Sequence, residues 1–207
     1  NVFRYNTFKN AMGSLSFRLG SDNQAYENYF YGEGPGDSVT DDNYQTGGIR
    51  VYGSGHLITN NYMEGLTGES WRRPILIDSG DTSNSTGNDR HEVATNTEVS
   101  FNTIIDSVAG GVFVGSTNYN RQPSGIVVRD NIVSSDQGIL FNNHANSAAN
   151  TWSNNIAHAS GSAAAVGGGS LGSSEVNVVS SEPAFTKPTP LTASDVGRFA
   201  VAAVPLT

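Results

Sequence analysis

The stretch Gly47–Met63, GGIRVYGSGHLITNNYM, holds the two patterns from which the fold can be predicted. It opens with a short apolar segment between glycines, residues 47–53. It closes with apolar residues on both sides of an asparagine, Asn61. Each pattern is too short to fold alone, so its meaning depends on whether it returns elsewhere in the chain.

The asparagine pattern does return, each time with apolar residues before and after it. Seven asparagines occupy the equivalent place: Asn6, Asn28, Asn61, Asn102, Asn131, Asn155 and Asn177. Consecutive members are separated by 22, 33, 41, 29, 24 and 22 residues. A basic period near 22 residues with insertions of variable length lies within the range of solenoid repeats.

The glycine-bounded pattern alternates with the asparagine pattern. Its copies are residues 13–20, 47–53, 74–78, 110–115 and 138–142. Each repeat therefore contributes at least two short strands with a sharp bend between them. Gly supplies positive φ at such bends, and Asn tolerates the left-handed region and bonds nearby backbone groups. Stacked Asn side chains can also hydrogen-bond along a ladder.

We therefore predict an all-β fold, a right-handed parallel β-helix. Its coils are expected over residues 1–181, and a Pro-rich cap or tail over residues 182–207 would protect the open edge. Coils that are too small to bury an apolar face alone share one core when they stack. The alternative is a β-sandwich with irregular strands, which gives no reason for Asn at equivalent places.

The composition argues against several classes of protein. Without cysteine, neither a disulfide framework nor a thiolate metal site can form. A formal net charge of −8 argues against nucleic-acid binding. Because no apolar run is long enough to span a bilayer, no membrane partner is expected. The polar, Cys-free, Lys-poor composition suggests a secreted or periplasmic protein.

Four longer insertions mark the candidate binding surface, since loops on one face of a solenoid usually build it. They are residues 32–46, 65–73, 80–95 and 115–124. Several of the 11 basic residues fall in these insertions or at strand ends. We therefore expect a local basic cleft on an acidic protein, which would suit an anionic substrate.

Residues 1–20, NVFRYNTFKNAMGSLSFRLG, resemble the active-site coil of the polysaccharide lyase family that contains alginate lyases and chondroitinase B. The family pattern there is roughly Asn-Thr-Phe, Gly, then Arg-His-Gly. Residues 47–62 look like the alginate-lyase version of the next coil, and residues 193–197 are similar to a common family ending. The resemblance covers most of the chain and is most specific over residues 1–66.

In that family the fold is a parallel β-helix, and the reaction is β-elimination across a uronic acid glycosidic bond. The resemblance implies a Lys base, an Arg acid and a calcium ion held by Asn and Glu. By position the arginine is Arg18, which we predict as the catalytic residue, while Leu19 stands where the family usually has His. The lysine and the calcium ligands would lie ahead of Asn1, so no residue of this chain is predicted as a metal ligand.

The resemblance also implies that N-terminal coils of the solenoid precede these residues. We expect a companion N-terminal segment of the same protein. Without it, residues 1–207 should be poorly soluble, because the first coil would expose an apolar core and an unpaired edge.

β-Elimination next to a carboxylate needs positive groups that stabilise an enolate-like transition state. Arg is suited to bidentate carboxylate recognition. The predicted substrate-binding residues are Arg50, Tyr52, His56, Arg72, Arg73 and Arg121. Tyr52 would stack on a sugar ring, and His56 would act in proton transfer or support the turn at which it stands. The other histidines, His91, His144 and His158, lack metal-ligand spacing and are predicted to be structural.

The relative orientation of Arg18 and Arg50 is a difficulty for this site. When the glycines that close the two segments are aligned, Arg18 falls beside Val51. Strict alternation would then send Arg18 and Arg50 to opposite faces of the sheet. A β-bulge in one strand would bring both arginines to one face.

The sequence thus predicts a polysaccharide lyase that cleaves an anionic polysaccharide, alginate before chondroitin-type chains. A non-catalytic carbohydrate-binding or surface β-helix protein is an alternative, favoured by Leu19 and by the missing upstream part of the site. A polygalacturonase-type hydrolase is a second alternative. It is suggested by the adjacent acids Asp41 and Asp42, although hydrolases need a defined separation between carboxyl groups.

Overall fold

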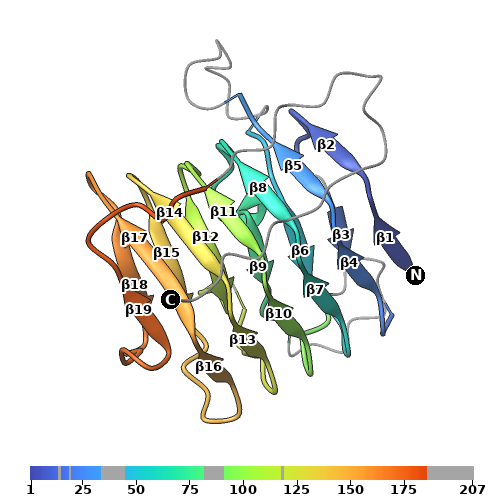
Figure 1. Ribbon diagram of the computed structural model, residues 1–207. Coiled ribbons are helices and arrows are strands. Elements are labelled where there is room, and N and C mark those ends of the chain that lie inside the picture. The colour runs from blue at the N-terminus through green and yellow to red at the C-terminus, as the bar shows by residue number, and fades with distance from the viewer. Residues whose placement is uncertain (14, 19, 34–44, 82–90, 118, 186–207) are drawn as a thin grey trace.

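The computed structural model describes residues 1–13, 15–18, 20–33, 45–81, 91–117 and 119–185. These residues form three parallel sheets, called A, B and C here, that wind into one solenoid (Figure 1). Sheet A contains β1 (Val2–Arg4), β4 (Gln24–Tyr26), β7 (Leu57–Thr59), β10 (Glu98–Ser100), β13 (Val127–Arg129) and β16 (Thr151–Ser153).

The other two sheets have the same order along the solenoid axis. Sheet B contains β2 (Thr7–Lys9), β5 (Tyr29–Tyr31), β8 (Tyr62–Glu64), β11 (Thr103–Ile105), β14 (Ile132–Ser135), β17 (Asn155–Ala159) and β19 (Val176–Val178). Sheet C contains β3 (Leu15–Phe17), β6 (Ile49–Val51), β9 (Ile75–Ile77), β12 (Gly110–Val114), β15 (Ile139–Asn143) and β18 (Ala164–Gly168).

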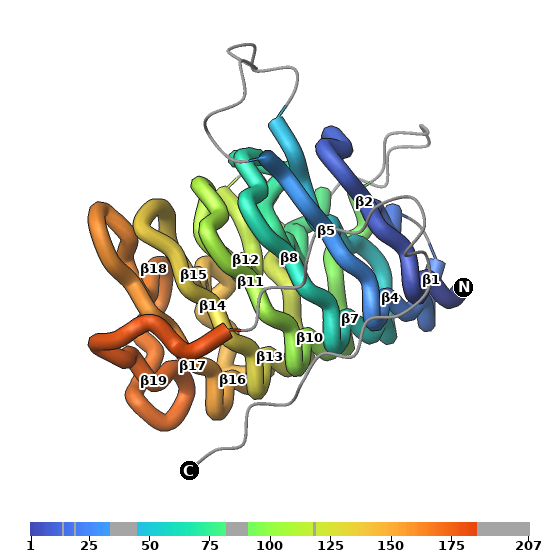
Figure 2. Tube along the Cα trace, turned by 45° about the horizontal axis from the view of Figure 1, so that its top comes forward, coloured from blue at the N-terminus to red at the C-terminus, as the bar shows by residue number. Residues whose placement is uncertain are grey.

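Each full coil visits sheet A, then B, then C, so the predicted right-handed parallel β-helix is confirmed (Figure 2). Every strand pairs with the equivalent strand of the next coil, as where Phe8 lies opposite Phe30 and Phe30 opposite Met63. Each coil contains three strands, whereas the sequence patterns predicted at least two. The apolar residues ahead of each repeated asparagine form their own sheet, sheet A.

The repeated asparagines form a side-chain ladder between sheets A and B. Asn28 shows the arrangement: its backbone N–H and its Nδ2 both donate to Oδ1 of Asn61, at 3.1 and 3.0 Å. The same Nδ2 also donates to the carbonyls of Tyr26 and Phe3. The ladder continues through Asn6, Asn28, Asn61, Asn102, Asn131 and Asn155. It satisfies backbone groups at the corner where no strand partner is present.

Two details of the ladder differ from the sequence-based expectation. The left-handed backbone belongs to the residue before each asparagine, such as Glu27 with φ 55° and Phe101 with φ 55°. Asn177 is not a rung, because it lies opposite Ile156, one position out of register, and is exposed. The ladder ends instead where Nδ2 of Asn155 donates to the carbonyl of Glu175.

The core runs along the solenoid axis and is filled by the inward side chains of all three sheets. Sheet C contributes alternate residues such as Phe17, Val51 and Ile77, which stack in register. Burial of each such side chain stabilises the fold by about 1.5–3 kcal/mol relative to exposure. The stacked coils therefore share the apolar surface that one coil could not bury.

The four insertions all border sheet C. Residues 32–46 and 65–73 connect strands of sheet B to sheet C, and residues 80–95 and 115–124 connect sheet C to sheet A. Sheet C is therefore the one sheet whose strands adjoin all four insertions in sequence. Asp41 and Asp42, with Leu19, lie outside the described residues.

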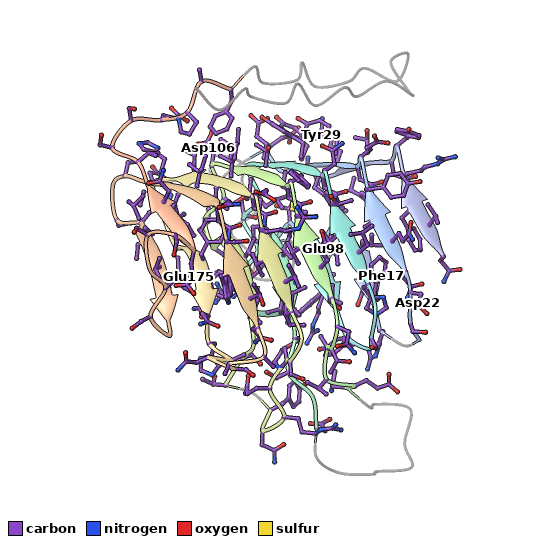
Figure 3. All side chains as sticks on the ribbon, turned by 60° about the horizontal axis from the view of Figure 1, so that its bottom comes forward. Phe17, Asp22, Tyr29, Glu98, Asp106 and Glu175 are labelled. Atoms are coloured by element: carbon purple, nitrogen blue, oxygen red, sulfur yellow. The ribbon has the colours of Figure 1, made fainter. Side chains whose placement is uncertain are left out.

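The described part of the tail runs along the outer face of sheet B. Phe185 packs against a hydrophobic cluster of Tyr29, Tyr62 and Ile105. Figure 3 shows Tyr29 on this outer side of the molecule. Residues 186–207 lie outside the described part of the chain. Across the described ranges, no helix has the length and apolar character needed to cross a bilayer.

Candidate functional site

An open cleft lies over the outer face of sheet C, at its N-terminal strands β3 and β6. It has a volume of about 230 Å³. Four arginines line it together with one tryptophan and four uncharged residues: Gly13, Leu15, Ser16, Arg18, Gly48, Arg50, Trp71, Arg72 and Arg73. Two lining segments come from strands of adjacent coils, and the third comes from the insertion at residues 65–73.

Arg18 and Arg50 lie on the same face of the sheet. Ser16, and not Phe17, is the partner of Arg50 in the parallel pairing of β3 with β6. Farther along, Ser21 bridges to Ser54, so the first coil has one more residue than the second between these two pairings. The extra residue accounts for the alignment difficulty, as the predicted bulge would.

Arg50 is held in place by a buried carboxylate. Its Nε and Nη2 both donate to Oδ2 of Asp78, at 2.9 and 2.7 Å. Asp78 is only 2% exposed and follows β9, the next strand of sheet C. Its other oxygen, Oδ1, accepts from the Ser79 N–H and the Ser116 hydroxyl. The guanidinium is therefore oriented before any ligand arrives.

Tyr52 completes this network and is not an open aromatic surface. Its hydroxyl donates to Oδ2 of Asp78 at 2.8 Å. The ring is 1% exposed, with the Arg50 guanidinium 4.8 Å from its centroid and the His91 ring 5.1 Å away. Burial and the Asp78 charge raise the pKa of Tyr52 well above its usual range. We therefore assign Tyr52 to the support of Arg50, where the sequence had suggested a sugar-stacking residue.

The exposed aromatic side chain of the cleft is Trp71, which the sequence analysis did not single out. It belongs to η2 (Ser70–Arg72), a single turn of 3₁₀ helix in the insertion, and is 39% exposed. Its indole lies against Gly13, where a Cβ atom would come within 2.7 Å of the ring. A side chain at position 13 would thus displace the indole. The sequence did contain a signal for this residue, namely a single Trp beside two arginines in a polar loop that begins with glycine.

The remaining predicted arginines fall into two groups. Arg72 lies over Trp71, with 4.2 Å between the guanidinium carbon and the ring centroid, and Arg73 lies over Phe113 at 3.7 Å. Both line the cleft. Burial lowers the pKa of Arg73, but an arginine stays protonated in proteins. Arg121 is exposed, pairs through its backbone with Gly80, and is not among the residues that line the cleft.

His56 has an interior position, 2% exposed. Its Nδ1 accepts from the Asn23 N–H at 3.1 Å, and Nε2 therefore donates to the Tyr52 carbonyl at 2.8 Å. Burial lowers the pKa of this imidazole. Both nitrogens are used in holding the turn together, so we assign His56 a structural role and not substrate contact.

The cleft is a cationic site on an acidic chain. It gathers four of the 11 basic residues, whereas the chain has a formal net charge of −8. Among the described residues that line it, none is an acid. A site of this charge attracts anionic groups such as carboxylates.

The described ranges hold no group of three or more His, Cys, Asp or Glu side chains that could ligate a metal ion. The carboxylate of Asp78, which bonds the cleft residue Arg50, already accepts from five donors. The described residues around the cleft therefore do not by themselves provide a calcium site.

Comparisons with known proteins add the following findings. The sequence model of the family described as Chondroitinase B matches residues 1–189. A solved structure of the PL6-family alginate lyase AlyGC is 22% identical, with a TM-score of 0.68 over 86% of this chain and 23% of that chain. A PL6 alginate lyase in complex with a trisaccharide is 18% identical, with a TM-score of 0.64 over 91% of this chain and 42% of its own.

A third structure is a mannuronic acid-specific polysaccharide family 6 lyase from human gut microbiota. It is 19% identical, with a TM-score of 0.58, and the match covers 77% of this chain and 35% of that chain. No curated protein sequence matches. The chain thus spans between about a quarter and two fifths of the length of these solved structures, and the likeness to them establishes the fold.

Proposed function

The chain belongs to the chondroitinase B family, and on that premise we propose that it forms part of a polysaccharide lyase that cleaves a polyuronate, alginate first, by β-elimination. The observation that supports this most is the cationic cleft on sheet C. It combines an exposed arginine, Arg18, with a preoriented one, Arg50, on one face of two adjacent coils.

The chemistry requires such a cleft. Removal of the proton next to a carboxylate builds negative charge on a group that is already anionic, so the transition state needs fixed positive groups around it. Arginine provides this charge and, through its planar fork, fixes the orientation of a carboxylate.

Arg18 is the group that we place at the reacting bond. It is exposed in the cleft, and no ion pair links it to a carboxylate among the described residues. Since a guanidinium hardly deprotonates, we propose that Arg18 stabilises the developing charge and orients the leaving glycosidic oxygen. A water molecule would then carry the proton to that oxygen.

The general base and the calcium ion suspected from the family resemblance would be supplied from outside these residues. We propose a companion N-terminal segment whose coils stack on β1, β2 and β3. In the described part of the chain each of these strands is the last of its sheet, with one edge unpaired. The cleft lies at this end, on β3, so coils added there would extend it.

Alginate is the proposed substrate because the similar solved structures include PL6 alginate lyases. Polyuronates are found outside the cytoplasm, so we also propose that the protein is secreted or periplasmic. The hydrolase alternative receives no support from the cleft, since the residues described there include no pair of carboxylates.

The test compares the intact protein with its Arg18→Ala variant on alginate, with calcium supplied, by following the ultraviolet absorbance of unsaturated products. Loss of one charge-stabilising donor should lower kcat by about 10²- to 10³-fold. Arg129→Gln is the matched control, because Arg129 pairs with Glu98 and Asp130 on the outer face of sheet A.

Three outcomes separate the alternatives. Absorbance growth that depends on Arg18 but not on Arg129 supports the lyase. Reducing ends that appear without absorbance would indicate a hydrolase. Polysaccharide binding by the intact protein without any product would favour the non-catalytic binding protein, an alternative that Leu19 in place of the family histidine motivates.

A further inference from the structure

Trp71 and Arg50 offer two complementary surfaces within the cleft. Trp71 keeps 39% of its surface exposed, although such a large apolar ring would normally be buried. The Arg50 guanidinium carbon lies 5.8 Å from the centroid of its ring. Gly13 supports one edge of the indole and Arg72 stacks on the ring, so its position is fixed from two sides.

Arg50 keeps part of its donor capacity free for a ligand. Arginine has five N–H donors, and Asp78 accepts two of them, one from Nε and one from Nη2. Nη1 has no hydrogen-bond acceptor among the described residues, and Arg50 lines the cleft, so this end of the fork is the one that we assign to a ligand. Paired nitrogens at this end match the two oxygens of a carboxylate.

Asp78 holds the Arg50 side chain in this orientation. Its five hydrogen bonds come from Arg50, Tyr52, Ser79 and Ser116. A buried carboxylate with that many donors does not exchange its partner for water. The side chain of Arg50 therefore loses little conformational entropy when a ligand binds, which favours affinity.

We propose that Trp71 and Arg50 form a subsite for one uronic acid unit of a polysaccharide chain, with the sugar ring stacked on the indole and its carboxylate on the free edge of Arg50. Asp78 is the positioning residue of this subsite. The cleft volume of about 230 Å³ is below the ~300–1,000 Å³ of drug-sized ligand pockets, which suits a single sugar unit. This proposal rests on the proposed function: the uronic acid unit bound here would be the one next to the bond at Arg18.

The subsite has a direct optical signal, because the chain has two tryptophans and the other, Trp152, is buried. Alginate-derived oligouronates are titrated into the intact protein carrying Arg18→Ala, which suppresses turnover, and tryptophan emission and its quenching by acrylamide are followed. We expect a saturable change in emission and protection from acrylamide. Both should be absent in the Trp71→Phe variant, which retains the Trp152 signal.

Charge recognition is tested by Arg50→Gln and Asp78→Asn, with calorimetry as the readout of binding. Loss of a charge-assisted pair should raise the Kd for the oligouronate by about 10- to 100-fold. Neutral mannose oligosaccharides of the same length should bind weakly and equally to all variants. Asp78→Asn should act in the same direction as Arg50→Gln but less strongly, and Arg129→Gln should leave the Kd unchanged.

The results would overturn the subsite in any of three ways. The first is that calorimetry detects no binding at millimolar oligouronate. The second is that binding leaves the emission of Trp71 and its quenching unchanged. The third is that Arg50→Gln weakens the binding of neutral and uronate ligands equally. The outcome is separate from that of the lyase proposal. If oligouronates bind at Trp71 but the unsubstituted protein forms no unsaturated product, the subsite is supported and the lyase proposal is rejected. If product forms and Trp71→Phe leaves KM unaltered, the lyase proposal is supported and the subsite is rejected.

Discussion

At the scale of single residues, the geometry of the cleft depends most on Asp78. This carboxylate is 2% exposed, yet its charge is balanced by Arg50 and its oxygens accept from Tyr52 as well as from Ser79 and Ser116. A buried ion pair contributes little net stability by itself. Its consequence here is orientation, because two N–H groups of Arg50 are held by one buried carboxylate oxygen.

The Tyr52 hydroxyl gives this network a measurable pH dependence. Tyr52 ionises near pH ~10 in an unfolded chain, and burial with the Asp78 charge raises its pKa in the folded state. The folded protein therefore retains a proton that the unfolded chain releases. Stability from this source is complete below pH ~10 and falls as the pH rises above it.

We predict that Tyr52→Phe lowers the free energy of unfolding by about 1.5–3 kcal/mol at neutral pH, since a hydrogen bond to a buried charge is lost. Above pH ~10 the variant should lose stability less steeply than the parent, by up to about 1.4 kcal/mol per pH unit. Urea unfolding at a series of pH values measures both quantities. An unchanged slope in alkali would show that Tyr52 does not hold its proton in the folded state.

At the scale of elements, the corner between sheets A and B is the most regular feature of the molecule. Each corner pairs a residue of positive φ with an asparagine whose side chain replaces the missing strand partner. Asn102 is 0% exposed, accepts from the N–H and Nδ2 of Asn61, and donates to Asn131 and to two carbonyls. The ladder therefore links neighbouring coils through buried hydrogen bonds.

We predict that Asn102→Ala lowers the free energy of unfolding by about 2–4 kcal/mol, because buried backbone donors lose their acceptor. The matched control is Asn177→Ala. Asn177 shares the sequence pattern but is exposed and out of register, so its replacement should change stability by less than about 0.5 kcal/mol. Equal losses in the two variants, measured by urea unfolding, would contradict the ladder as a source of stability.

The same asparagines show what the sequence could and could not predict. Six of the seven rungs were predicted correctly because stacked coils impose the same corner each time, and that requirement repeats in the sequence. Asn177 was predicted wrongly, since apolar–Asn–apolar also describes an ordinary strand with a polar outward residue. The pattern identifies a strand of the solenoid but does not settle which residue of that strand reaches the corner.

The site was less predictable than the fold for a physical reason. The arginines of the cleft were predicted from their charge and their place at strand ends, and the structure brings four of them together. Trp71 is a single residue in an insertion, with no repeat to mark it. Tyr52 and His56 lie next to turn glycines in sequence, but their burial depends on neighbouring coils that no local pattern reports.

At the scale of the whole molecule, the insertions turn a regular solenoid into an asymmetric one. All four adjoin strands of sheet C in sequence, while the described tail lies along sheet B and surface ion pairs of Arg129 lie on sheet A. The cleft lies on the first two described coils, beside β1, β2 and β3, which are the last strands of their sheets. The proposed companion segment would stack on these strands and extend the cleft.

The most direct test of this account is a crystal structure of the intact protein, carrying Arg18→Ala to prevent turnover, with a bound alginate oligosaccharide. We predict a sugar chain over the outer face of sheet C, crossing β3 and β6. One unit should stack on Trp71 with its carboxylate on Arg50, and the next glycosidic bond should lie beside residue 18. A chain bound on the outer face of sheet A or B, or one on sheet C without contact to Trp71 and Arg50, would contradict the account.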